Sequence, residues 1–303
     1  MKKHGKYQNS LIKDSMGDRV FHAINLVVLT VIFLLVLYPI IYVVSASFSS
    51  PEALMSGQVW LWPVKPTLEG YQIMLQNDRV WTGFANSFYY MIVGTIFSMF
   101  VTILAAYPLS RRDFRPRGAI AMLFAFTMWF NGGMIPEYLL VKDLHMLNTR
   151  WAMILPTAMS VWNMVIMRTY FQNSIAEELL ESAKLDGCDD FNFVVKIVLP
   201  LSTPVLAVIA LYYAVGQWNS FFNAMIYLQD QSLHPIQLVL RDILLLNTTQ
   251  DVTADLVTSS RKELMGELLK NSLIVVSSIP MLILYPFVQK HFVKGIMVGS
   301  VKG

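Results

Sequence analysis

The stretch from Phe21 to Val44, FHAINLVVLTVIFLLVLYPIIYVV, contains no Asp, Glu, Lys or Arg. A membrane-spanning helix needs roughly 20 mostly apolar residues, because the hydrocarbon core of a bilayer is about 30 Å thick. Within that core, only helices and closed barrels satisfy their own backbone hydrogen bonds. A cleaved signal peptide is the alternative, but this apolar run exceeds the roughly 7–15 residues of such a leader. We therefore expect a retained transmembrane helix.

Five more stretches of this kind follow along the chain, which has 303 residues, 55% of them hydrophobic and 14% charged. Soluble domains carry about 25% charged residues. The composition therefore predicts an all-α membrane protein with six transmembrane helices. The predicted spans cover residues 21–44, 85–109, 120–140, 153–171, 201–228 and 273–292, and Asn131-Gly132-Gly133 and Pro136 interrupt the third.

Lys and Arg residues are distributed unequally between the two sides of these spans. Fifteen of the 23 lie on the side of the N-terminus, four of them in the short loop RRDFRPRG. Cytoplasmic loops carry an excess of these residues, so both termini are expected in the cytoplasm. The chain then divides into a cytoplasmic segment at 1–19 and a membrane domain at 20–303, with a cytoplasmic loop at about 173–200 and outer loops at about 47–84 and 229–270.

The second outer loop contains apolar residues at helical spacing, namely Ile236, Val239, Leu240, Ile243 and Leu244. An amphipathic helix of this kind is typical of packing at a membrane surface. It would also suit a docking surface for an extracellular partner. Periodicity leaves both interpretations open.

The cytoplasmic loop holds a polar, helix-forming segment, ESAKLDGCDDFNFVVKIVLP, from Glu181 to Pro200. Ser174 and Glu177 have the spacing of a capping box, which would begin a helix there. Gly187 suits the left-handed residue that often follows a helix. Residues 176, 180, 183 and 187 share a small, apolar face that another surface could approach closely. These residues alone predict either a connector at the bilayer surface or an element that transmits force from a soluble partner to the spans.

The same segment resembles the EAA loop of ABC importer permeases. The family pattern is Glu-Ala-Ala, three residues, Gly, nine residues, Ile, any residue and Leu-Pro. It is matched at Glu181, Ala183, Gly187, Ile197, Leu199 and Pro200, with Ser182 in place of the middle alanine. The resemblance implies a cytoplasmic coupling helix between spans four and five that docks in a cleft of an ATPase. The implied coupling residues are Glu181, Ser182, Ala183, Asp186 and Gly187.

Three other segments, NGGMIPEYLLVKDLHMLNTRWAMILP, GQWNSFFNAMIYL and YPFVQKHFVKGIMVGSVKG, resemble carbohydrate-importer permeases of the maltose type, which are MalG-like. More narrowly, they are similar to the LplC/YtcP-like branch, associated with oligosaccharides from complex polysaccharides. The likeness covers about residues 18–303. It implies half of a translocation pathway for an oligosaccharide, together with a second homologous permease subunit, two ATPase subunits and an extracellular sugar-binding protein.

ATP and Mg²⁺ would then be used by the ATPase subunits, because the chain contains no Gly-x-x-x-x-Gly-Lys-Ser/Thr phosphate loop. The chain itself is expected to bind no cofactor and to catalyse no reaction. The resemblance also suggests that the basic, glycine-rich end VKGIMVGSVKG contacts the ATPases. Without it, this end would face anionic membrane lipid.

Polar residues within spans are costly and usually face a cavity or a neighbouring helix. Amide groups hydrogen-bond sugar hydroxyls, and aromatic rings stack on the apolar faces of sugars. Asn219 and Asn223 are four residues apart, so they would share a helix face. The alternatives are hydrogen bonds between spans and, in span three, a simple bend near the outer surface. The candidates for a sugar pathway are Tyr213, Gln217, Trp218, Asn219 and Asn223 in span five, and Trp129 and Asn131 in span three.

Two other classes of protein compete with a permease. A stand-alone secondary transporter often carries buried ionisable residues for ion coupling, which the predicted span interiors almost lack. An intramembrane enzyme would need a catalytic dyad or metal ligands, and the five histidines are scattered. The net charge of +3 is too small to indicate nucleic acid. We therefore expect a multi-pass protein of the bacterial plasma (inner) membrane.

Overall fold

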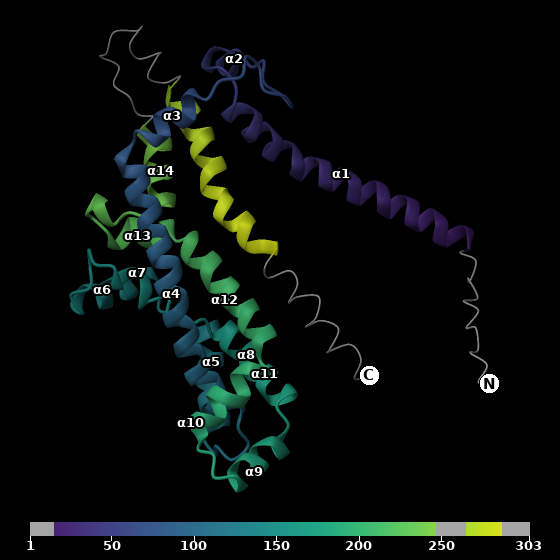
Figure 1. Ribbon diagram of the computed structural model, residues 1–303, viewed down its shortest axis with the longest axis vertical. Helices are drawn as coiled ribbons and strands as arrows, with labels where there is room; N and C mark the ends of the chain where they lie inside the picture. The colour runs from purple at the N-terminus through teal and green to yellow at the C-terminus, as the bar shows by residue number, and fades with distance from the viewer. Residues whose placement is uncertain (1–14, 247–264, 287–303) are drawn as a thin grey trace. The chain divides into compact units, whose positions relative to one another are not determined.

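A computed structural model describes residues 15–246 and 265–286, and within these ranges every regular element is a helix. The chain divides into two compact units, residues 1–68 and 69–303 (Figure 1). The C-terminal segment VKGIMVGSVKG and the last part of the sixth predicted span lie outside the described residues.

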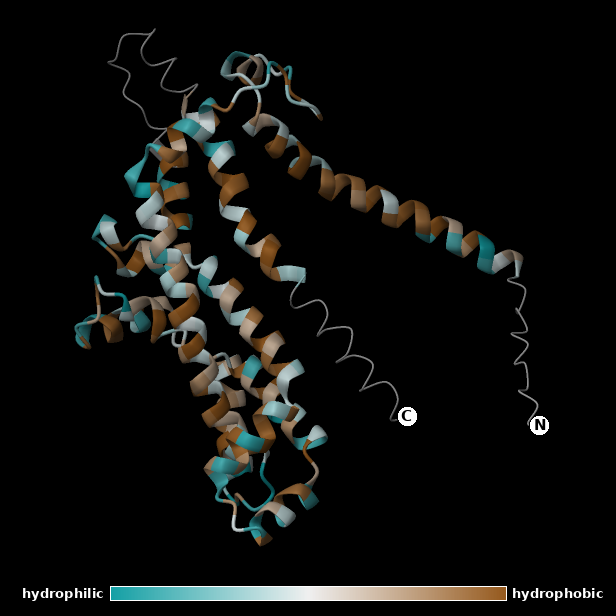
Figure 2. Ribbon diagram, viewed as in Figure 1, coloured by the Kyte–Doolittle hydropathy of each residue, from teal (hydrophilic) through white to brown (hydrophobic). Residues whose placement is uncertain are grey.

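The first unit contains a long apolar helix and a small folded loop. Helix α1 (Met16–Ser47) begins at a capping box between Ser15 and Asp18, and its middle is almost uniformly hydrophobic (Figure 2). In its last turn, the Ser45 hydroxyl donates to the Leu61 carbonyl at 2.7 Å. Short helix α2 (Pro51–Met55) follows. The start of the predicted outer loop is therefore an ordered turn rather than an extended linker.

The second unit is organised around helix α4 (Asp78–Ser110), which packs against α8 (Val161–Ser174), α12 (Thr203–Trp218) and α14 (Ile236–Leu246). Small side chains let membrane helices approach closely. The buried face of α4 is rich in such residues: Gly83, Ser87, Gly94, Ser98, Thr102 and Ala106. This face explains why α4 has so many helical neighbours.

The predicted interruption of the third span is confirmed. Helices α5 (Arg117–Trp129) and α6 (Met134–Asp143) are bent by 115° at their junction. The Asn131 side-chain oxygen accepts from the Gly133 N–H at 2.8 Å, and Gly133 has φ +91°, where a side chain would be strained. The turn therefore depends on the residues singled out in the sequence.

The predicted cytoplasmic loop folds into a chain of short helices. They are α9 (Glu177–Leu185), α10 (Asp190–Phe193), a π-helical turn (Val194–Val198) and α11 (Leu199–Leu201). A bend of 85° then separates the segment Asp190–Leu201 from α12. Figure 1 shows α9 and α10 at the end of this unit opposite α3 (Glu69–Leu75) and α14.

The remaining short helices are α7 (Trp151–Ile154), α13 (Phe221–Tyr227) and a 3-10 turn (Gln231–Leu233). The amphipathic helix predicted near Ile236 is confirmed as α14. Its apolar residues Ile236, Val239 and Ile243 are buried in a cluster with Val80 of α4. Since the bundle itself covers this face, it is not free for an extracellular partner.

Among the described residues, three helices are long and apolar enough to cross a membrane: α1, α4 and Met265–Pro286. The number rises to five if each of the two bent pairs is one span. Helix α8, in the predicted fourth span, has 14 residues, about 21 Å at 1.5 Å per residue. That is shorter than the hydrocarbon core. The count of six spans and the cytoplasmic termini stay predictions.

Candidate functional site

The predicted coupling loop begins differently from its prediction. Helix α8 ends at Ser174, Ile175 is extended, and α9 starts at Glu177 with Ala176 as its N-cap and no side-chain cap. The predicted capping box is therefore wrong, because Ser174 belongs to the last turn of the preceding helix. Glu177 and Glu178 still place negative charge at the positive end of α9, where it is favourable.

The end of α9 confirms the role predicted for Gly187. The Cys188 N–H donates to the Ala183 carbonyl at 2.9 Å, and the Gly187 N–H donates to the Lys184 carbonyl at 3.1 Å. This pair of bonds is the Schellman motif, which needs a left-handed residue after the cap. Gly187 has φ +77°, and a Cβ added there would meet no atom within 4 Å. The glycine is therefore required by backbone conformation and not by lack of space.

The small face of α9 points into the protein. Ala183 is 7% exposed and is clustered with Phe171 and Phe193, and Leu180 packs against the same cluster. The expectation that another surface approaches this face is wrong at its middle, because Leu180 and Ala183 are covered by α8 and α10, whereas Ala176 and Gly187 at its two ends are exposed. Among the implied coupling residues, only Ala183 is buried, whereas Glu181, Ser182, Asp186 and Gly187 are exposed.

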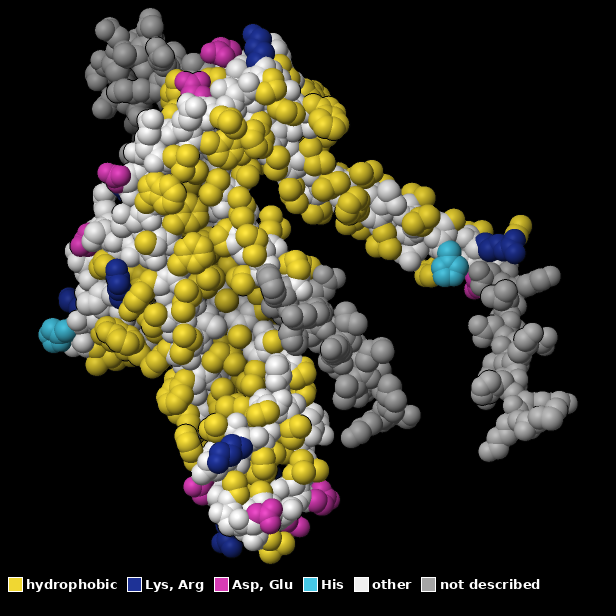
Figure 3. Space-filling view, in the orientation of Figure 1, with side chains coloured by type: hydrophobic (Ala, Val, Ile, Leu, Met, Phe, Trp, Pro, Cys, Tyr) yellow, Lys and Arg dark blue, Asp and Glu magenta, His cyan; other side chains and the backbone are white. Residues whose placement is uncertain are grey.

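Two large apolar side chains lie on the outside of this loop. Leu185 is 90% exposed and Phe191 is 76% exposed. Figure 3 shows acidic and basic side chains gathered at the same end of the second unit, beyond its broad hydrophobic surface. Apolar residues at the core of a charged rim are typical of protein-protein interfaces.

A cavity of about 380 Å³ lies beside α12 and the break that follows it. Most of its lining residues carry polar groups, although apolar atoms make up the larger part of its surface. Every residue that lines it is neutral. The lining combines amides, hydroxyls and aromatic rings: Thr157, Ser160, Asn163, Tyr212, Tyr213, Gly216, Gln217, Asn219, Ser220, Phe222 and Asn223. These groups donate and accept hydrogen bonds without fixed charge, so the cavity suits a hydroxyl-rich solute.

Hydrogen bonds hold two of the lining side chains in place. The Tyr213 hydroxyl lies 2.6 Å from the Thr102 hydroxyl of α4 and accepts from the Ser160 N–H at 3.0 Å. The Gln217 side-chain amide donates to the Thr157 hydroxyl at 3.0 Å. Gln217 Oε1 is buried and accepts no hydrogen bond from the described residues.

The structure brings together four of the seven residues predicted for the sugar pathway: Tyr213, Gln217, Asn219 and Asn223. Asn219 and Asn223 do not share one continuous helix face, because α12 ends at Trp218 and α13 begins at Phe221. They reach the same cavity from the two sides of this break.

The other three predicted pathway residues lie elsewhere. Trp218 is 1% exposed, packs against Phe84 and Phe88, and donates to the Ser277 carbonyl at 3.2 Å. It is a core residue between helices. Trp129 and Asn131 are exposed at the bend between α5 and α6 and do not line the cavity.

Sequence reasoning missed the contribution of the segment between α7 and α8. Thr157 and Ser160 line the cavity from there, and Asn163 lines it from the first turn of α8, although none of the three was singled out. The available signal was a run of small polar residues within an otherwise apolar predicted span. No sequence pattern indicated that Phe222 lines the cavity, because its position depends on the break after α12.

A bundle of apolar helices with broken spans, a neutral polar cavity and an exposed loop at one end is the architecture of a transporter's membrane subunit. Residues 95–237 match the family described as binding-protein-dependent transport system inner membrane component. The chain is 41% identical to the polygalacturonan/rhamnogalacturonan transport system permease protein YtcP of Bacillus subtilis (strain 168), over 95% of this chain and 100% of that protein. It is 38% identical to protein LplC of the same organism, over 96% of this chain and 97% of that protein.

A solved structure agrees with these relatives. It is a crystal structure of a bacterial ABC transporter involved in the import of the acidic polysaccharide alginate, matched with a TM-score of 0.84 and 35% identity. The match covers 92% of this chain and 99% of the other. The chain therefore belongs to the family of binding-protein-dependent transport system inner membrane components, as a sugar ABC transporter permease. Members are non-catalytic, multi-pass subunits of the inner membrane.

Proposed function

We propose that this chain forms half of the membrane pathway of an ATP-driven importer for oligosaccharides. A second homologous permease subunit completes the pathway, two ATPase subunits drive it, and an extracellular binding protein delivers the sugar. The observation that carries the proposal is the exposed Leu185–Phe191 segment on a loop that keeps the EAA pattern. A stand-alone secondary transporter is no longer favoured, because the chain belongs to a family of permease components.

In this proposal the ATPase contacts the outer side of α9 and α10. Leu185 is the main apolar anchor, and the exposed residues Glu181, Ser182, Asp186 and Gly187 surround it. ATP and Mg²⁺ are bound by the ATPase and not by this chain. Burial of one leucine side chain contributes about 1.5–3 kcal/mol, so this residue alone would strongly affect docking.

The cavity beside α12 is proposed as the part of the sugar pathway that this chain supplies. Its amides and hydroxyls can bind sugar hydroxyls, and Tyr212 and Phe222 can stack on the apolar faces of sugar rings. Two similar proteins are named for acidic polysaccharides, which supports an acidic oligosaccharide as cargo. Because this lining contains no cation, the charge of such a cargo would be balanced outside this cavity.

The docking proposal is tested with Leu185→Arg in the assembled transporter. Placing a charge at the apolar anchor should reduce co-purification of the ATPase subunits at least about tenfold, since 1.4 kcal/mol corresponds to a factor of ten. Leu61→Arg is the matched control, because Leu61 is also exposed but lies in the predicted outer loop. Full retention of the ATPase by Leu185→Arg would overturn this docking face.

The cargo is tested by measuring ATP hydrolysis by the complex with its binding protein. Oligogalacturonates should stimulate hydrolysis, whereas their neutral, carboxyl-reduced counterparts should not. Equal stimulation by the neutral sugars would refute the proposal that the cargo is acidic, but it would leave the proposal of an importer intact.

A further inference from the structure

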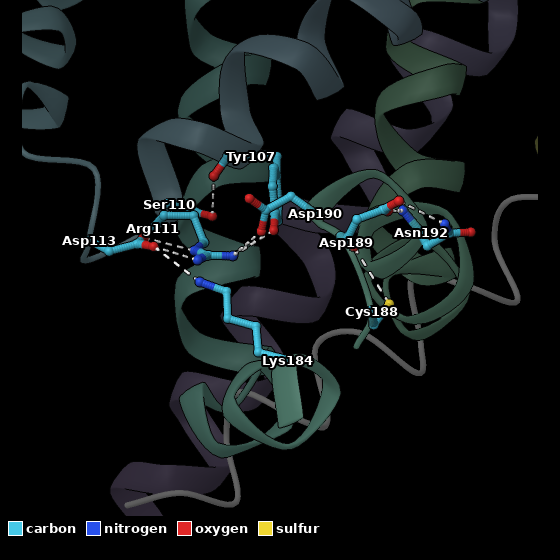
Figure 4. Close-up of polar contacts among 9 residues, drawn as sticks. All are labelled: Tyr107, Ser110, Arg111, Asp113, Lys184, Cys188, Asp189, Asp190 and Asn192. Carbon is cyan, nitrogen blue, oxygen red and sulfur yellow. Dashed lines mark hydrogen bonds and ion pairs between the residues drawn. The ribbon is translucent and has the colours of Figure 1, made fainter. Parts of the chain in front are cut away.

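The cytoplasmic end of α4 is joined to the coupling loop through one arginine. Arg111 follows the last residue of α4, and its guanidinium is bonded to three different segments (Figure 4). Nη1 donates to the Tyr107 hydroxyl in α4 at 2.7 Å. Nε and Nη2 donate to the two carboxylate oxygens of Asp113 at 3.0 and 2.6 Å, and Nη1 lies 3.4 Å from Asp190 Oδ1 in α10.

Burial distinguishes Arg111 from its partners. The Arg111 side chain is 13% exposed, whereas the side chains of Asp113 and Asp190 are 59% and 66% exposed. A planar guanidinium can hold a carboxylate with two parallel bonds and still reach a second one, which a lysine ammonium does less well. Arg111 is therefore the central residue of the group, and the acidic residues attach it to the following loop and to α10.

Two more ion pairs connect the same loop to α9. Lys184, near the end of α9, lies 3.8 Å from Asp113, and Arg112 lies 3.1 Å from Glu177 at the start of α9. Both ends of α9 are thus tied to residues 111–113. Figure 4 shows Lys184 reaching Asp113 while Asp190 approaches Arg111 from the other side.

Apolar packing holds α9 only in part. Ala183 is its one buried residue. A cavity of about 610 Å³ lies between this loop and the end of α4, lined in part by Arg111, Arg117 and Glu177. Since part of the space beneath α9 is not filled with side chains, the ion pairs form a large share of the connection between α9 and α4.

Helix α4 continues from this connection to the wall of the polar cavity. Thr102 of α4 is hydrogen-bonded to Tyr213, and Gly94 of α4 lies against Gln217. Tyr213 and Gln217 both line the cavity. A displacement of the α4 end is therefore passed directly to residues that face the cavity.

We propose that Arg111 is a positioning residue that couples movement of the α9–α10 loop to α4, and through α4 to the cavity. This inference rests on the proposed function, in which the ATPase docks on that loop. Arg111 contacts neither sugar nor ATP in this role. Its loss should separate ATP hydrolysis from transport while the complex stays assembled.

The test uses the full complex with its binding protein in proteoliposomes. The readout is the number of sugar molecules imported for each ATP hydrolysed. Asp190→Asn removes only the α10 ion pair and keeps the shape of the side chain. Since exposed ion pairs contribute about 0.2–1 kcal/mol, this ratio should fall by about 1.4- to fivefold. Arg111→Gln should lower it further, and Arg111→Lys should lie between them.

Arg115→Gln is the matched control, because Arg115 is exposed in the same loop and forms no ion pair with the described residues. It should leave the ratio unchanged. If Arg111 only stabilised the structure, its loss would lower assembly, sugar import and ATP hydrolysis together and would leave the number of sugars imported for each ATP unchanged. An unchanged number of sugars for each ATP in both Asp190→Asn and Arg111→Gln would therefore overturn the inference. If the wild-type complex itself imports sugar without ATP, the proposed function fails, and not only the role of Arg111.

Discussion

Gly94 of α4 lies directly against Gln217 of α12, one of the residues that line the cavity. A Cβ at position 94 would lie 2.8 Å from Gln217 Cδ, 2.9 Å from Nε2 and 3.0 Å from Cγ. Gln217 is 4% exposed and donates to Thr157, so it cannot move aside without losing that bond. Gly94→Ala is therefore expected to destabilise the protein, although alanine is the better helix former.

The magnitude follows from three terms. Replacing a helical glycine by alanine gains about 0.5–1 kcal/mol. Overpacking a buried contact costs about 1–3 kcal/mol, and losing the bond to Thr157 costs about 0.5–1.5 kcal/mol. The net expectation is a destabilisation of about 0.5–4 kcal/mol. In a Gln217→Ala background the clash and the bond are both absent, so the same change should stabilise by about 0.5–1 kcal/mol.

The assay is the thermal unfolding midpoint of the purified complex for the four members of this double-mutant cycle. Gly94→Ala should lower the midpoint in the wild-type background and raise it in the Gln217→Ala background. The sign reversal is the diagnostic result, because it does not depend on the absolute scale. Equal and additive effects in both backgrounds would show that Gly94 and Gln217 are not in this contact.

Three further predictions concern other parts of the chain. A Cβ at Gly216 would meet no atom within 4 Å. Gly216→Phe should therefore fill the cavity and reduce sugar transport at least about tenfold, while binding of the ATPase subunits is kept. Gly216→Ala, the control, should transport sugar normally. At Gly187, where φ is +77°, Gly187→Val should reduce the free energy of unfolding by about 1–2 kcal/mol through left-handed strain, seen as a lower thermal midpoint. Gly187→Asn should reduce it by less; equal effects would mean that strain is not the cause. Burial lowers the pKa of His234 from its ordinary 6.5. The charge of Asp242 raises this pKa in part, and the charge of Arg79 lowers it further. The contribution of His234 to the free energy of unfolding should thus be complete above pH 6.5 and should fall as the pH decreases below 6.5, because the unfolded chain binds the proton first. His234→Gln should flatten this pH dependence. An unchanged slope of stability against pH in this variant would exclude His234 as its source.

Backbone signals in the sequence were reliable where a single residue type fixes the conformation. The bend near Gly133 and the helix end at Gly187 were both predicted, since each needs a positive φ. The apolar run of the first predicted span became α1 with a few residues added at each end. These features are local, so tertiary packing did not have to be known.

Predictions failed where neighbours along the chain competed for the same residue. Ser174 has the right spacing for a capping box, but α8 extends through it. The break after Trp218 occurs at Asn219 and Ser220 without glycine or proline, so helical spacing wrongly joined Asn219 to Asn223. Periodicity also grouped the small face of α9 correctly but could not say whether that face was covered, because burial depends on α8 and α10.

Arg111 shows the same limit for charged residues. In the sequence it indicated only the orientation of a short loop. Its role became visible when the fold brought Asp190, 79 residues away, next to it. The polar cavity likewise combines residues of α12 with Thr157 and Ser160, which the sequence alone could not place together.

The measurement that tests the central claim most directly is sugar uptake into proteoliposomes containing the complex of this chain, its second permease and its ATPase subunits. With the binding protein and labelled oligosaccharide outside and ATP inside, uptake should require ATP hydrolysis and should stop when the ATPase subunits are omitted. Uptake that continues without ATPase subunits, driven by an ion gradient, would contradict the account.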